Sequence, residues 1–193
     1  LKQHLLNVDE DYNTWLKNGI IVGLCLRTTW RTETISAINT NDISFIPVNN
    51  QTFASIKVKK SKTNQCGETF IYSIDPNDSN KALCLVTLLQ KYLIIFHGKN
   101  WKQKETLLFL NKNNEKLKST DVTIIINEMT KKSNIKEKFS SKSLRTGAVA
   151  WMLESGFTIE NIKALGWSET STAFNCYIRN TANAMKGGTS KMF

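Results

Sequence analysis

The chain has few prolines, cysteines and histidines, and it has no long apolar run. Among its 193 residues are 2 prolines, 2 histidines and 4 cysteines. The longest apolar stretch, Gly19 to Leu26, is too short to span a bilayer, which takes about 20 residues. The polar start of the chain does not resemble a signal peptide. The sequence therefore predicts neither a membrane span nor a secretory leader.

The small number of cysteines and histidines also limits which metal and redox sites are expected. The cysteines are scattered without C-x-x-C spacing, and the histidines are isolated: Cys25, Cys66, Cys84, Cys176, His4 and His97. This pattern predicts free thiols in a reducing compartment and no zinc or other metal site. The chain also lacks a glycine-rich phosphate loop and a parallel βαβ pattern, so it does not read as a nucleotide-binding domain.

Positive charge is in clear excess. Lysine and arginine number 26 against 16 acidic residues, which gives a net charge of +10. Such an excess favours a polyanionic partner, nucleic acid more often than an anionic membrane surface, although a solvated basic surface remains the plain alternative. The apolar fraction of 40% is enough for the core of one domain.

Hydrophobic periodicity predicts an α+β domain that is mainly α, with a small antiparallel sheet near its N-terminal third. Ile43 to Ile46 start a strand that Pro47 with Asn49-Asn50 is expected to end. Strand signals also run from Phe53 to Lys62 and from Thr69 to Ile74, a hairpin with lysines toward its tip. Helices are expected at 10–27, 34–38, 79–96, 119–129, 140–156, 158–166 and 169–180. Ser140 or Ser141 would open the 140–156 helix, whose apolar stripe includes Trp151, and Thr158 would cap the next helix. Because apolar residues cover most of its circumference, the 79–96 helix is expected to be buried, with Ser79 as its N-cap.

Residues that suit phosphodiester chemistry stand in a fixed order along these elements. Arg31 follows the first helix, and Lys62 lies in the hairpin. Three further segments follow in the C-terminal third: Lys142-Ser143-Leu144-Arg145, Leu165-Gly166-Trp167 and Cys176-Tyr177-Ile178-Arg179. Two arginines, a lysine and a tyrosine are sufficient to hold a phosphodiester and attack it covalently.

This order and spacing resemble the catalytic domain of the tyrosine recombinase (phage integrase) family over residues 12–179. The Gly-Leu-Arg-type segment of that family matches Thr29-Trp30-Arg31, its His-x-x-Arg box matches Lys142 to Arg145, and its nucleophile matches Tyr177. The Ser61-Lys62-Thr63-Asn64-Gln65 box is similar to the eukaryotic mobile-element branch, including tyrosine-recombinase retrotransposons and Cryptons. Two positions depart from the family pattern: Lys142 replaces the usual His, and Thr34 replaces a common acidic residue.

The resemblance implies a site-specific DNA recombinase that works through a 3′-phosphotyrosine link, without ATP, metal or other cofactor. Arg31 and Arg145 would hold the non-bridging oxygens, and Lys62, or alternatively Lys60, would protonate the leaving 5′-oxygen. Trp167 would donate its indole N–H to phosphate or pack against the Tyr177 helix. The DNA backbone would be contacted by four basic residues: Lys57, Lys59, Lys60 and Arg179.

Each of these residues taken alone has a structural explanation: a helix cap for Arg31, a basic sheet edge for the lysines, a packed aromatic for Tyr177. Two other functions also remain open. One is a recombinase-derived module that binds DNA without cutting it, which Lys142 and Thr34 favour. The other is a type IB topoisomerase-like relaxing enzyme.

The resemblance also carries expectations about organisation. Residues 1–180 would form the catalytic domain, and the tail at 181–193 would dock on a neighbouring subunit of a dimer or tetramer on duplex DNA. The N-terminal core-binding domain of the family is expected to be missing from this chain, which starts without Met. The expected location is the nucleus in a eukaryotic host and otherwise the cytoplasm or nucleoid.

Overall fold

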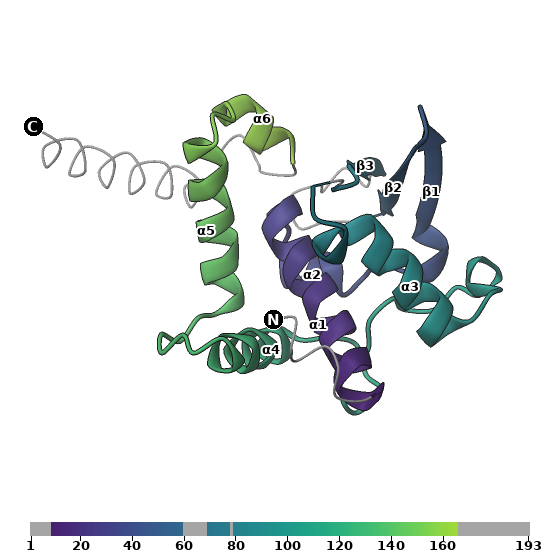
Figure 1. The fold of residues 1–193 in the computed structure, drawn as a ribbon, viewed down its shortest axis with the longest axis horizontal. Helices are drawn as coiled ribbons and strands as arrows, with labels where there is room; N and C mark the ends of the chain where they lie inside the picture. The colour runs from purple at the N-terminus through teal and green to yellow at the C-terminus, as the bar shows by residue number, and fades with distance from the viewer. Residues whose placement is uncertain (1–8, 60–68, 78, 166–193) are drawn as a thin grey trace, which may run out of the picture.

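The computed structural model describes residues 9–59, 69–77 and 79–165, which form a group of helices with a small sheet at one side (Figure 1). The α-helices are α1 (Asp9–Thr28), α2 (Thr32–Ile35), α3 (Leu85–His97), α4 (Ser119–Lys132), α5 (Ser141–Glu154) and α6 (Ile159–Ala164). The strands are β1 (Ile43–Val48), β2 (Gln51–Val58) and β3 (Phe70–Ile74), and short 3-10 turns are η2 (Thr40–Asp42), η3 (Lys81–Leu83) and η4 (Trp101–Gln103). The mainly α prediction with a small antiparallel sheet is confirmed.

The sheet is antiparallel in the order β1-β2-β3. The β1–β2 turn uses Asn49 and Asn50, whose φ angles of 47° and 65° are those of a tight two-residue hairpin. The predicted end of the first strand at Asn49-Asn50 is confirmed, but Pro47 does not end it, because β1 continues to Val48, which pairs with Gln51. Proline is tolerated there because β1 is an edge strand, where one side of the backbone needs no partner.

The alternation predicted for the hairpin is largely confirmed. Ala54, Ile56 and Val58 are buried, and Lys57 is exposed on the other face. Ser55 shares that outer face but is also buried, because it lies on the central strand between the two flanking strands.

The main core lies between α1, α3 and the inner face of the sheet. α1 buries four aliphatic side chains completely, and they meet side chains from α3, the sheet and Phe109: Leu16, Ile20, Ile21, Leu24, Leu89, Leu93, Ile43 and Ile56. Cys25 and Cys84 are buried free thiols, as predicted; Cys66 and Cys176 lie outside the described residues. Burial raises the pKa of the Cys25 thiol to about 12, so this group is inert near neutrality.

The predicted helix at 79–96 needs two corrections. It begins at Leu85 with Cys84 as its N-cap, not at Ser79, because η3 occupies the intervening turn. It is also not buried all round: Ile94, Ile95 and Phe96 are exposed. The last turn of α3 extends beyond the elements that cover its first turns, so the apolar composition of a helix does not by itself determine its burial.

The C-terminal part of the described chain places α4, α5 and α6 in succession. In Figure 1, α5 rises from the end of α4 and carries α6 at its far end, on the side of the molecule opposite the sheet. Ser140 and Thr158 are the N-caps of α5 and α6, as predicted. A second small apolar cluster joins these two helices: Val149, Met152 and Ile162. Trp151, predicted to lie on the buried stripe, is instead 58% exposed.

Candidate active site

The segment that leads into Arg31 is shaped by the end of α1. The Thr28 hydroxyl donates to the Leu24 carbonyl at 2.7 Å and accepts the Trp30 backbone N–H at 3.1 Å. Between them Thr29 has a φ of 53°, in the left-handed region that is unfavourable for a β-branched residue. The chain therefore reverses sharply after α1, which turns Trp30 into the core and places Arg31 at the start of α2.

Arg31 caps α2 with its backbone and not with its side chain. Its carbonyl accepts the N–H groups of Thr34 and Ile35 at 3.0 and 3.2 Å, and its side chain makes no capping hydrogen bond. Arg31 itself is half-buried, at the N-terminal end of α2. The cap explanation for Arg31 thus accounts for its main chain only, which favours a separate role for the side chain.

The Lys142 to Arg145 box lies on the first turns of α5, and its two basic residues differ in environment. Lys142 is exposed, whereas Arg145 is only 8% exposed on the inward face that continues to Ala148 and Val149. α5 packs against α1, whose end leads into Arg31. Arginine is rarely buried to this degree, so Arg145 fits a binding site better than a solvated surface position.

The start of α5 is held in place by α4. The Asn127 amide donates to the Phe139 carbonyl at 2.8 Å and accepts the Phe139 N–H at 2.9 Å. At the first residue of α4, the hydroxyl of Ser119 lies 2.8 Å from that of Ser141. These contacts hold the residues on either side of the N-cap Ser140. They therefore set the position of the first turns of α5, which carry Lys142 and Arg145.

A long-range hydrogen bond brings the end of α6 to the same region. The indole N–H of Trp30 donates to the Leu165 carbonyl at 3.2 Å, across 135 residues of sequence. Leu165 is the last described residue before the predicted site residue Trp167. The turn that carries Arg31 and the C-terminal end of α6 are therefore adjacent.

The predicted DNA-binding lysines of β2 have unequal environments. Lys57 is exposed on the outer face of the sheet. The Lys59 ammonium lies 2.9 Å from a Glu105 carboxylate oxygen and 3.1 Å from the buried Asp42 carboxylate. The hydrogen bonds to Glu105 and then to Asp42 raise the pKa of Lys59. With its charge shared by two carboxylates, Lys59 is better placed to anchor the end of β2 than to contact phosphate.

Several predicted site residues lie outside the described residues: Lys60, Lys62, Trp167, Tyr177 and Arg179. Their assignments stay predictions. Thr34, which departs from the family pattern, is described and is buried on α2. In the described part of the chain, no three His, Cys, Asp or Glu residues gather where they could hold a metal ion, and no helix is long and apolar enough to cross a membrane.

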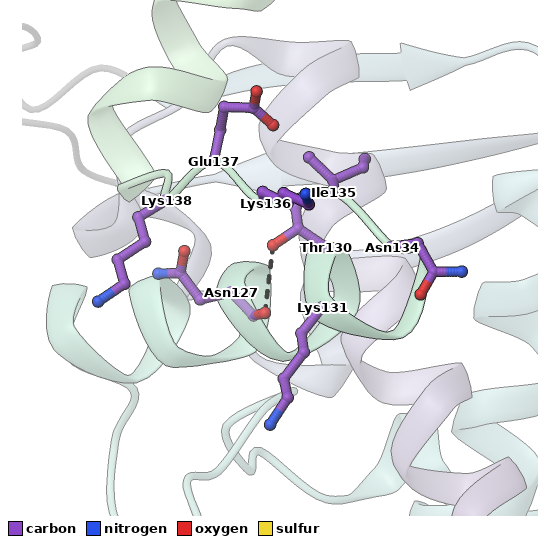
Figure 2. A pocket seen from close by; sticks show the side chains of 8 residues that line it. All are labelled: Asn127, Thr130, Lys131, Asn134, Ile135, Lys136, Glu137 and Lys138. Carbon is purple, nitrogen blue, oxygen red and sulfur yellow. Dashed lines mark hydrogen bonds between the residues drawn. The ribbon is translucent and has the colours of Figure 1, made fainter.

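A basic hollow at the α4–α5 junction was not predicted from the sequence. It has a volume of about 540 Å³ and is lined by Asn127, Thr130, Lys131, Asn134, Ile135, Lys136, Glu137 and Lys138 (Figure 2). Figure 2 shows Lys131 and Lys138 extending outward, with Glu137 directed away from them. Within the described ranges, no ion pair links Lys131, Lys136 or Lys138 to a carboxylate.

The density of lysine between 131 and 138 was the available sequence signal for this hollow. The linear pattern did not show that Asn127 folds the segment back against α4. That hydrogen bonding is what brings the lysines together directly before the Lys142 to Arg145 box.

The described part of the chain is thus a mainly helical domain with a three-stranded sheet. The helix that leads into Arg31 packs against the helix that carries Arg145, and a basic hollow lies before the second arginine. The chain belongs to the phage integrase family, which it matches over residues 3–184. This confirms the family assignment made from the order of Arg31, Arg145 and Tyr177.

Solved recombinase structures share the fold at low sequence identity. The XerA recombinase gives a TM-score of 0.61 at 15% identity, covering 95% of this chain and 63% of that one. The XerH site-specific recombinase, bound to its palindromic difH substrate after cleavage, gives 0.64 at 15% identity, covering 97% and 49%. A lambda integrase dimer bound to a core site gives 0.52 at 16% identity, covering 89% and 47%.

This chain thus spans about half to two thirds of the length of these recombinases. A comparison with curated proteins finds no match. The likeness confirms the predicted tyrosine recombinase catalytic-domain fold.

Proposed function

We propose that this chain is the catalytic domain of a site-specific DNA recombinase, or integrase, that cuts and rejoins strands through Tyr177. The observation that carries the proposal is the buried Arg145 on a helix packed against α1, whose end presents the Arg31 side chain free of any capping role. Membership of the phage integrase family supports the same function. Residues 1–180 would be the catalytic unit, with 181–193 as a docking tail.

The reaction exchanges one phosphodiester for another. The Tyr177 hydroxyl gives up its proton to water or a neighbouring base as its oxygen attacks the phosphorus. The bond from phosphorus to the 5′-oxygen breaks, and Lys62 in its charged form gives a proton to that oxygen. The products are a 3′-phosphotyrosine link and a free 5′-hydroxyl, which rejoins by the reverse step. Arg31 and Arg145 would hold the two non-bridging oxygens, where negative charge increases in the transition state.

The substrate would be duplex DNA, engaged by a dimer or tetramer on paired sites. The net charge of +10 supports a polyanionic partner. The XerH and lambda integrase structures are DNA complexes, and the latter is a dimer, which supports the same arrangement here. Such a protein would work where its host keeps its DNA, in a nucleus or a nucleoid.

The test of this function is a covalent adduct. The chain is incubated with a nicked suicide duplex that carries candidate terminal sequences of a mobile element, and products are resolved in SDS. An SDS-resistant protein–DNA adduct in the wild type, and none in Tyr177→Phe, is the expected result. DNA binding without adduct, also in a longer protein that includes an N-terminal clamp domain, would contradict it and favour a non-cutting module. Relaxation of a supercoiled plasmid without any specific site would favour a topoisomerase instead.

The basic hollow provides a second testable part of the proposal, a contact with the DNA backbone beside the cleaved phosphate. Neutralising phosphates releases condensed counterions, so log K falls with log[salt] by about 0.9 per contact. We expect Lys136→Gln/Lys138→Gln to weaken duplex binding and to reduce that slope by about 1 to 2.

The matched control is Lys91→Gln/Lys99→Gln, which removes two exposed charges around the end of α3, outside the hollow. Binding is measured by fluorescence anisotropy from 50 to 300 mM salt, in a Tyr177→Phe background that prevents cleavage. Equal slopes for the two double variants would remove the hollow from the DNA interface.

A further inference from the structure

Trp30 contacts two segments that are distant from it in sequence. It directly precedes Arg31, and its ring packs edge-on against two aromatics of β3, with centroids 6.1 Å from Phe70 and 5.1 Å from Tyr72. Its indole N–H donates to the carbonyl of Leu165 beyond α6. Trp30 therefore touches the strand that returns from the lysine hairpin and the residue from which the chain continues toward Tyr177.

The polar end of this side chain has a specific partner. Trp30 is only 5% exposed, and a buried indole N–H needs an acceptor. Leu165 is the C-cap of α6, a helix of only 6 residues, and carbonyls at a helix end have no partner within the helix. The indole N–H and the Leu165 carbonyl therefore satisfy each other. Because a helix of this length is not stable by itself, α6 depends on such tertiary contacts for its position.

The backbone around Trp30 is held from both sides. Before it, Thr29 is kept in the left-handed region, a conformation that persists only where the surroundings impose it. Beside it, the Tyr72 hydroxyl donates to the Arg27 carbonyl at 2.9 Å, which ties β3 to the last turn of α1. Trp30 thus sits on a rigid base, and among the described residues its hydrogen bond to the end of α6 is the one through the indole N–H.

We propose that Trp30 is a positioning residue for strand cleavage, which holds the end of α6, from which the chain continues in sequence to Tyr177, against the turn of Arg31. This inference rests on the proposed function, because it assigns Tyr177 to that chain as the nucleophile. The indole N–H is the part of the side chain that acts, and the ring supports β3. A phenylalanine at this position retains a ring against Phe70 and Tyr72 but cannot donate to Leu165.

Trp30→Phe is therefore the informative variant, with Trp151→Phe on the exposed face of α5 as its matched control. We expect Trp30→Phe to bind uncut duplex within about twofold of the wild type and to form the covalent adduct about tenfold more slowly, the loss of one hydrogen bond in the positioned state. Trp151→Phe should match the wild type in both. An unchanged adduct rate in Trp30→Phe, or an equal loss of binding and cleavage, would overturn the proposal.

A measurement that does not depend on activity separates this inference from the proposed function. Amide hydrogen exchange is followed in the full chain for peptides that cover residues 159–177 and, as a reference, α4. Trp30→Phe should accelerate exchange beyond Leu165 while α4 exchanges at the wild-type rate. Unchanged exchange beyond Leu165 would overturn the inference even if the wild type forms the adduct. Absence of any adduct would overturn the proposed function, whereas the exchange result could still be interpreted.

Discussion

Replacing Arg145 with Gln is expected to lower the rate of covalent adduct formation about 10²- to 10³-fold. Loss of one preorganised donor to a developing oxyanion typically raises the barrier by about 2.7–4 kcal/mol, and Arg145 is the candidate donor that is best shielded from water. Its shielding strengthens the effect, because a charge in a site with little water is less screened. The measurement is single-turnover cleavage of a nicked suicide duplex.

Two companion variants make this result specific. Arg145→Lys keeps the charge but loses the planar fork that binds two oxygens, so it should recover only part of the rate. Lys142→Gln changes an exposed neighbour on the same helix and tests the position at which the family usually has His. A denaturant midpoint for Arg145→Gln far below that of the wild type would point to a structural role, and an unchanged cleavage rate would exclude Arg145 from the site.

Phe109→Ala is expected to lower the free energy of unfolding by about 3–5 kcal/mol. Phe109 is 1% exposed, and its ring centroid lies 5.3 Å from that of Tyr92 in the centre of the main core. Removal of a large buried aromatic loses its transfer free energy and leaves a cavity that the neighbours only partly fill. Urea unfolding monitored by circular dichroism measures the change.

Phe96→Ala is the matched control because Phe96 also stacks on Tyr92, with a centroid separation of 4.4 Å, but is 43% exposed. We expect a loss of no more than about 1.5 kcal/mol for this aromatic contact, since little buried volume is vacated. Comparable losses in the two variants would mean that the last turn of α3 is covered in solution, contrary to its exposure in the structure.

Local sequence pattern predicted the elements well because their causes are local. The alternation of Ala54, Ile56 and Val58 gave the inner face of β2, and the side chains of Ser140 and Thr158 marked the starts of α5 and α6. The errors came where burial depends on neighbours. The apolar residues at 94–96 and Trp151 were expected in the core, yet no described element covers them.

The candidate site shows the same division. The sequence alone determined the family, through the order and spacing of Arg31, Arg145 and Tyr177, because chemistry selects residue types at positions that a linear pattern preserves. It could not assign Lys59 to the carboxylates of Asp42 and Glu105, since those residues lie far apart along the chain.

Only the tertiary structure decided which side chains support the site. Asn127 reaches across 12 residues to hold the start of α5, and Trp30 reaches across 135 to hold the end of α6. Both contacts satisfy backbone groups that lie outside regular hydrogen-bonded ladders, a requirement that arises only once the chain is compact. Periodicity carries no record of such pairings, because the partner of a backbone carbonyl is determined by the packing of distant elements.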